Sequence, residues 1–116
     1  MVILEPAVSF ESLLKNQKFS DLKLQCGSEL FPAHRAILAG RSEVFSTMLM
    51  SDMQEAHAGT LHVEDISTTT FDIILRYIYT GKVSTELDPD LLHEIIYGAE
   101  KYGLNELKNY CFRKLV

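Results

Sequence analysis

Alternating apolar and polar residues over 22–26 predict a β-strand. One face would carry the apolar residues and the other the polar ones, namely Leu22, Leu24 and Cys26 against Lys23 and Gln25. The Gly27-Ser28 dipeptide that follows predicts a tight hairpin turn, because glycine accepts the positive φ that such turns need. The chain then returns over 29–31, and Pro32, which lacks an N–H, is expected to end the pairing.

Helical periodicity predicts two short helices after this hairpin. The first carries Ile37 and Leu38 and is expected to stop at Gly40. Ser42 can cap the second helix, whose apolar face is formed by Val44, Phe45, Met48 and Leu49. The polar stretch 51–59 is typical of a loop, and renewed alternation after it predicts a third strand around Leu61 and Val63.

The C-terminal half is predicted to be mostly helical. Ser67 can cap a helix whose apolar stripe consists of Phe71, Ile74, Leu75, Ile78 and Tyr79. Gly81 would end it before a short edge strand over 82–84. Asp88 and Pro89 supply a cap and a first helical residue for the next helix, and a last amphipathic helix follows. The predicted fold class is α+β, in the order helix, hairpin, two helices, strand and three helices.

The N-terminal segment adds one further apolar stripe. Residues 1–8 form a linker or a short strand, and the domain proper is expected over 9–116. Ser9 can cap a first helix on which Phe10, Leu13 and Leu14 share one face. Spacing alone favours burial of this stripe, because an apolar stripe is more often core than interface.

Composition and charge narrow the class of protein. A chain of 116 residues with 47% hydrophobic residues suits one domain with a real core. The net charge of −5 and the scattered Lys and Arg residues argue against a nucleic-acid surface. No apolar run approaches the roughly 18 residues that span a bilayer. Cys26 and Cys111 are interpreted as reduced core thiols, which fits the nucleus, the cytoplasm or both, and a disulfide is the less favoured alternative.

Residues for catalysis or metal binding do not form any recognisable pattern. The histidines, which are His34, His57, His62 and His93, have no metal-ligand spacing with each other or with cysteine. The sequence contains neither a glycine-rich phosphate loop nor a nucleophile elbow. We therefore expect a binding module rather than an enzyme, with no cofactor and no metal.

Several short blocks together resemble the BTB/POZ domain family. They are FSD at 19–21, PAHRAIL at 32–38, RSEVFSTM at 41–48, IYTG at 78–81 and AEKYGL at 99–104. The resemblance covers nearly the whole chain and is closest to the MATH-BTB group, the speckle-type POZ proteins. It implies a BTB/POZ fold, a small β-sheet covered by a cluster of five to six α-helices.

The resemblance also implies a homodimer. The first BTB helix packs across a two-fold interface, so the expected interface residues are Phe10, Leu13 and Leu14, together with Ile37 on the next helix. Asp21 and Arg35 match a charged pair that recurs near the dimer groove, and the resemblance implies that the pair is buried or half-buried. The sequence by itself favours two unrelated surface charges, because most charged residues are exposed.

A cullin-3 site is the second implication of the resemblance. Adaptors that bind cullin-3 carry a hydrophobic residue, any residue and a glutamate after the third main helix, and here Met53, Gln54 and Glu55 match. Tyr97 is expected to add contact area. The alternative is that Met53 packs into its own core and Glu55 is solvated. The implied function is an adaptor that binds the N-terminal region of cullin-3 and receives substrate through a domain not in this chain.

Two further functions stay open. One is a dimerisation domain of a transcription regulator that binds corepressor peptides in a groove at the dimer interface. The other is a monomeric elongin-C-like linker, against which the stripe of Phe10, Leu13 and Leu14 speaks, since such linkers lack a first helix. Flanking domains would separate the first two, because zinc fingers favour the regulator and kelch or MATH domains favour the adaptor.

Overall fold

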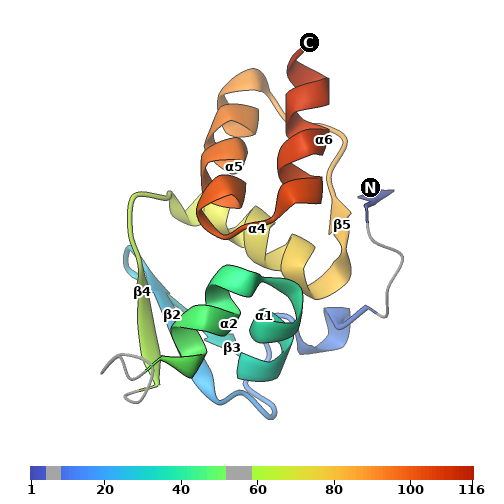
Figure 1. Cartoon of the computed structure of the whole chain (residues 1–116). Coiled ribbons are helices and arrows are strands. Elements are labelled where there is room, and N and C mark those ends of the chain that lie inside the picture. Colours follow the sequence, from blue (N-terminus) through green and yellow to red (C-terminus); the bar gives the residue numbers. More distant parts are fainter. Residues whose placement is uncertain (5–8, 52–58) are drawn as a thin grey trace.

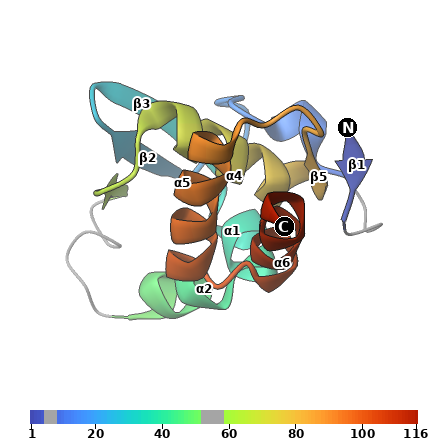
Figure 2. The same ribbon diagram turned by 90° about the horizontal axis from the view of Figure 1, so that it is seen from above.

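The computed structural model of this chain describes residues 1–4, 9–51 and 59–116. Within these ranges the elements are β1 (Val2–Ile3), the 3-10 helix η1 (Glu11–Leu13), β2 (Leu22–Cys26), β3 (Glu29–Ala33), α1 (Arg35–Arg41), α2 (Glu43–Met50), β4 (Thr60–Val63), α4 (Thr68–Thr80), β5 (Lys82–Val83), α5 (Pro89–Lys101) and α6 (Asn105–Leu115). The α+β class is confirmed. Figures 1 and 2 show the sheet of β2, β3 and β4 at one end of the helical cluster and the β1–β5 pair at the other.

The larger sheet has the strand order β3-β2-β4. β2 runs antiparallel to β3 and parallel to β4, so the hairpin and the third predicted strand meet on the two sides of β2. The three apolar residues of β2 are buried, and the turn residue Gly27 has a φ of +60°. The strand pattern and the hairpin turn predicted from the sequence are therefore confirmed.

Pro32 does not end the hairpin, contrary to the prediction. It lies opposite Lys23, and the register continues to the pair of Leu22 and Ala33. The N–H of Lys23 donates to the carbonyl of Gly59 at 2.8 Å, so it points toward β4 and away from Pro32. Proline is tolerated because β3 is an edge strand and this position needs no donor.

α1 also continues past the residue predicted to stop it. Gly40 lies inside the helix, and the boundary is Ser42, which serves both α1 and α2. The Ser42 hydroxyl accepts from the Phe45 N–H at 3.1 Å and donates to the Tyr102 carbonyl at 2.7 Å. The predicted cap is confirmed, and the same side chain ties the helix pair to the end of α5.

The predicted first helix is a single 3-10 turn, η1. Ser9 does accept from the N–H of Glu11 at 3.2 Å, as a cap would. The helix cannot propagate, because Leu14 is extended and Lys15 has a φ of +58°. Lys15 instead forms an ion pair with Asp72 on α4 and lies over the ring of Phe31, which directs the chain away from the helical path.

The remaining helix boundaries follow the predicted signals. Ser67 accepts from the Thr70 N–H at 3.2 Å, and Asp88 accepts from the Leu91 N–H at 2.8 Å. Gly81 ends α4 in the left-handed conformation with a φ of +72°. The expected edge strand after it is β5, which pairs antiparallel with β1.

Tyr79 on α4 connects elements that are far apart in the chain. Its hydroxyl accepts from the His34 N–H at 3.0 Å and lies 2.7 Å from Nδ1 of His34, while its carbonyl accepts from the Phe10 N–H at 2.7 Å. His34 Nε2 lies 2.9 Å from the carbonyl of Lys18, which can only accept. The Nε2–H tautomer therefore satisfies the cluster, with the Tyr79 O–H donating to Nδ1. Burial raises the pKa of Tyr79 to about 12, so its O–H stays protonated.

We predict that Tyr79→Phe destabilises the fold. The change keeps the buried ring but leaves Nδ1 and the N–H of His34 without their partner, which costs about 1–3 kcal/mol of unfolding free energy. Urea unfolding followed by circular dichroism measures this loss. Tyr97→Phe is the matched control, since Tyr97 is exposed and should change stability by no more than about 0.5 kcal/mol. Equal stabilities of the two variants would contradict a structural role for the hydroxyl.

Candidate interaction surfaces

The stripe predicted on the first helix lies at the outer side of η1. The side chain of Phe10 is 36% exposed, and Leu13 and Leu14 are half-buried against the core. The backbone bond from Phe10 to Tyr79 attaches this turn to α4. The structure thus leaves part of each of these apolar side chains exposed, and we call the three residues the N-terminal apolar face.

Ile37 behaves differently from the other three residues predicted for the interface. It lies on α1 and is only 9% exposed, so most of its surface is already covered within one protomer. A charged substitution at this position would therefore damage the core as well as any contact with a second chain.

Phe19 was not predicted as a surface residue, and it is 80% exposed. Its φ of +62° is unusual for a bulky residue, because Cβ then crowds the backbone. The adjacent Lys18 is held through its carbonyl by His34, which fixes the segment that presents the ring. In the sequence, Phe19 is simply an apolar residue just before a strand, which gives no sign of exposure. Its outward orientation follows from the backbone conformation.

Asp21 and Arg35 are brought together where β2 begins and α1 begins. An Asp21 carboxylate oxygen accepts from the backbone N–H of Arg35 at 2.8 Å, and Arg35 Nε donates to the Asp21 carbonyl at 3.2 Å. His34, the residue before α1, gives no side-chain cap. Asp21 therefore supplies the missing cap from a neighbouring strand, and its charge suits the positive end of the helix dipole. The predicted burial is wrong for Asp21, which is exposed because it lies at the start of the strand, while Arg35 is half-buried as expected.

The predicted cullin-3 residues fall into two groups. Met53, Gln54 and Glu55 lie outside the described residues, between α2 and β4 in the chain. Tyr97 is described, lies on α5 and is 51% exposed. Met50, the last residue of α2, was not predicted and is 82% exposed. The sequence signal that could have predicted this exposure is that Met50 does not belong to the apolar stripe of that helix.

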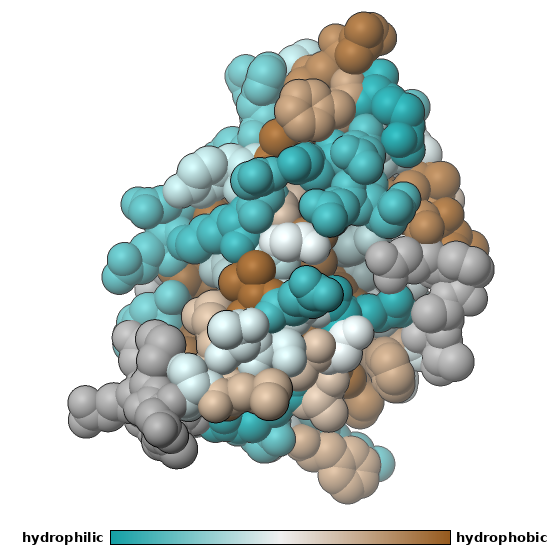
Figure 3. All heavy atoms as spheres, in the orientation of Figure 1, coloured by the Kyte–Doolittle hydropathy of each residue, from teal (hydrophilic) through white to brown (hydrophobic). Residues whose placement is uncertain are grey.

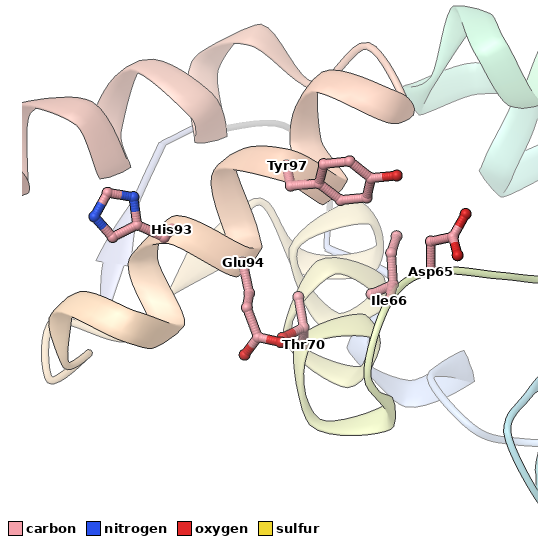
Figure 4. A pocket seen from close by; sticks show the side chains of 6 residues that line it. All are labelled: Asp65, Ile66, Thr70, His93, Glu94 and Tyr97. Atoms are coloured by element: carbon pink, nitrogen blue, oxygen red, sulfur yellow. The ribbon is translucent and has the colours of Figure 1, made fainter.

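Tyr97 borders a groove of about 320 Å³ between α5 and the turn from β4 to α4. The residues that line it are Asp65, Ile66, Thr70, His93, Glu94 and Tyr97. Figure 4 shows the Tyr97 ring beside Ile66 and Asp65, the Glu94 side chain extending toward Thr70, and His93 set apart from the others. Gly98 on α5 allows this helix to lie close to Ile74 on α4 and to Ile66. A Cβ at this position would overlap Ile74 Cδ1 and lie 3.4 Å from Ile66 Cδ1.

The face around this groove is otherwise polar. Figure 3 shows hydrophilic residues over much of α5 and α6, and a group of apolar residues at the C-terminal end of α6. The exposed Tyr97 side chain is suited to partner contacts on such a surface, because a tyrosine ring is apolar and its hydroxyl is polar.

The metal-ligating and nucleophilic side chains that the structure describes lie within residues 1–4, 9–51 and 59–116. Across those ranges, no three His, Cys, Asp or Glu side chains come close enough to hold a metal ion. Among the described residues, no helix has the length and apolar character needed to cross a membrane. Cys26 and Cys111 are buried free thiols, and burial raises both pKa values, that of Cys111 to about 11. Both thiols are therefore poor nucleophiles.

Comparison with known proteins assigns the family. The sequence profile of the BTB/POZ domain matches residues 10–116. The chain belongs to the BTB/POZ domain family. A BTB/POZ domain-containing protein of Arabidopsis thaliana is 34% identical over 106 residues, which is 87% of this chain and 43% of that protein. TD and POZ domain-containing protein 2 of Mus musculus is 35% identical over 99 residues, covering 85% of this chain and 27% of that protein.

Solved BTB domains share the architecture. The BTB domain of zebrafish PATZ1 superposes with a TM-score of 0.71 at 29% identity, covering 84% of this chain and 75% of the other. The BTB domain of human Gigaxonin gives a TM-score of 0.71 at 27% identity, with coverages of 83% and 77%. This BTB domain is thus a protein–protein interaction module, of a family whose members typically dimerise and bind partners. It spans less than half the length of the curated relatives named above.

We predict that Asp21 and Arg35 are energetically coupled. Asp21→Asn and Arg35→Gln should be non-additive in a double-mutant cycle, with a coupling of at least about 0.5 kcal/mol, because the two residues cap and clamp the same junction. Urea unfolding gives the four stabilities. The ion pair of exposed Glu100 with half-buried Lys108 is the control, with Glu100→Gln and Lys108→Gln expected to couple more weakly. Additive effects at Asp21 and Arg35 would dismiss the pair.

Proposed function

We propose that this BTB domain is a homodimeric adaptor that recruits a cullin-3 ubiquitin ligase scaffold to substrates held by another domain. The observation that carries the proposal is the half-exposed Tyr97 ring at the edge of an apolar groove on α5. The sequence motif Met53-Gln54-Glu55 adds to it. Both the nucleus and the cytoplasm suit such a role, since they keep Cys26 and Cys111 reduced.

Dimerisation is supported by the N-terminal apolar face. Phe10, Leu13 and Leu14 present apolar surface on a short turn that a protomer alone leaves uncovered, and Phe19 extends outward from the neighbouring segment. We infer that these exposed apolar side chains form an interaction site, because apolar patches on soluble monomers usually mark one. A two-fold axis would bring the same face of two copies together, as isologous interfaces require.

Cullin-3 recruitment is supported by the exposed Tyr97 ring at the groove and by the sequence of the motif. The motif precedes β4 in the chain, and the groove residues Asp65 and Ile66 follow β4. We infer that one partner uses both the motif and the groove, because exposed apolar and aromatic side chains are typical anchors of an interface.

The alternative function is binding of a corepressor peptide by a transcription regulator. A second groove of about 230 Å³ favours it, lined by Gln17, Ser20, Lys23, Leu30 and Pro32. Leu30 lies half-exposed on the edge strand β3, where an extended peptide could dock. The adaptor is preferred, because only that function also uses Tyr97 and the hydrophobic-x-glutamate motif.

We predict that Leu13→Asp converts the protein into a folded monomer. The carboxylate would be desolvated between two copies but can reach water in a half-buried position on one. Light scattering at micromolar concentration measures the mass. Phe112→Asp is the matched control, since Phe112 is 50% exposed on α6, away from this face, and should stay dimeric. A wild-type monomer under these conditions would rule out the dimer.

We predict that Met53→Asp abolishes most of the affinity for the N-terminal region of cullin-3. If Met53 fills a pocket on the partner, binding should weaken by well over tenfold, on the order of 2 kcal/mol. Calorimetry measures the affinity. Light scattering and thermal unfolding should give the wild-type mass and melting temperature, which separates partner contact from folding. Unchanged affinity of this variant would remove Met53 from the interface.

A further inference from the structure

We propose that the groove beside Tyr97 receives one apolar side chain of the partner, flanked by basic side chains that pair with Asp65 and Glu94. This inference rests on the proposed recruitment of cullin-3, and it specifies the chemistry that the partner must present. The groove would then determine which partners bind, in addition to providing contact area.

The groove has an apolar interior of limited size. Ile66 is half-buried at its base, the ring of Tyr97 forms one wall, and Thr70 is fully buried. Its volume of about 320 Å³ lies at the lower end of the range for small-molecule sites, about 300–1,000 Å³. A single large side chain inserted from a partner surface fits this space, and apolar anchors of this kind carry much of the energy of an interface.

Thr70 does not compete for polar contacts in the groove. Its N–H donates to Ser67 Oγ at 3.2 Å, and its hydroxyl oxygen accepts from Ser67 Oγ at 3.0 Å. Both polar groups are therefore already engaged in capping α4. Polar recognition by this groove is left to the exposed groups at its rim.

The rim of the groove carries two separate acidic side chains. Asp65 lies in the turn after β4, Glu94 lies on α5, and both side chains belong to exposed residues. His93 is the remaining titratable group of the lining apart from Tyr97, and Figure 4 shows it apart from both carboxylates. The whole chain carries a net charge of −5 as well. Lys or Arg side chains on the partner would complement this rim, and like charges would be repelled.

Asp65 is held in place by its backbone. Its φ of +64° is left-handed, a conformation that aspartate and asparagine adopt more readily than other non-glycine residues. Lys101 Nζ donates to the carbonyl of the preceding Glu64 at 2.8 Å, so α5 and this turn are joined directly. The carboxylate is thus presented from a fixed corner, and Asp65→Asn removes the charge without changing the backbone preference.

The test measures the affinity of the N-terminal region of cullin-3 by calorimetry at low and high salt. We expect Asp65→Asn with Glu94→Gln to bind about tenfold more weakly at low salt, and to lose much of the salt dependence of the wild type. Glu86→Gln with Glu106→Gln changes the net charge equally, and neither residue lines the groove, so this control should bind within about twofold of wild type. Tyr97→Ala should weaken binding at both salt concentrations, because it removes an apolar wall.

The outcomes separate this inference from the proposed function. Wild-type affinity and salt dependence in the Asp65 and Glu94 double variant, with normal binding by the wild type, would overturn the basic flanks and leave the adaptor function intact. Unchanged binding by Tyr97→Ala would overturn the apolar insertion. A wild-type protein that does not bind cullin-3 at all would overturn the proposed function and this inference with it. Circular dichroism melting curves confirm that each variant is folded.

Discussion

The cluster of Tyr79, His34 and the Lys18 carbonyl is the constraint on which the two ends of this domain depend. Tyr79 lies in the middle of the core on α4 and is fully buried, so each polar group around it must find a partner without water. The Tyr79 hydroxyl accepts from the His34 N–H just before α1, and the His34 imidazole bonds the Lys18 carbonyl in the segment before β2. The Tyr79 carbonyl accepts from the N–H of Phe10, just before η1. The apolar residues proposed for dimerisation are therefore positioned by a polar cluster.

The two proposed interaction surfaces are built from different elements. The N-terminal apolar face uses η1 and the segment before β2, while the groove uses α5 and the turn between β4 and α4. They share the helix α4, which lies under both and is rigidly packed. A dimer can thus present two separate partner grooves, since covering one surface does not require covering the other. This arrangement suits a module that brings two scaffolds to one assembly.

Close packing and exposed charge have distinct roles at the groove. Gly98 has no side chain, and α5 consequently packs tightly on Ile74 and Ile66, which defines the apolar base. Asp65 and Glu94 sit at the rim, where water still reaches them, so they contribute more to partner choice and association rate than to the stability of the fold. Tyr97 can contribute both to apolar packing and to polar contacts, because its ring is apolar and its hydroxyl is polar.

The sequence by itself determined the elements whose signals are local. These signals depend only on neighbouring residues, and together they predicted the α+β fold. They are the alternation in β2, the glycine turn, the serine and aspartate caps, and the helical stripes of α4 and α5. Tertiary structure decided the rest. The η1 turn stays short because Lys15 pairs with Asp72, and Pro32 is tolerated because β3 is an edge strand. Asp21 caps a helix 14 residues away, and Phe19 points outward on a left-handed backbone. These features depend on contacts between segments distant in the chain, and residue periodicity carries no information about such contacts.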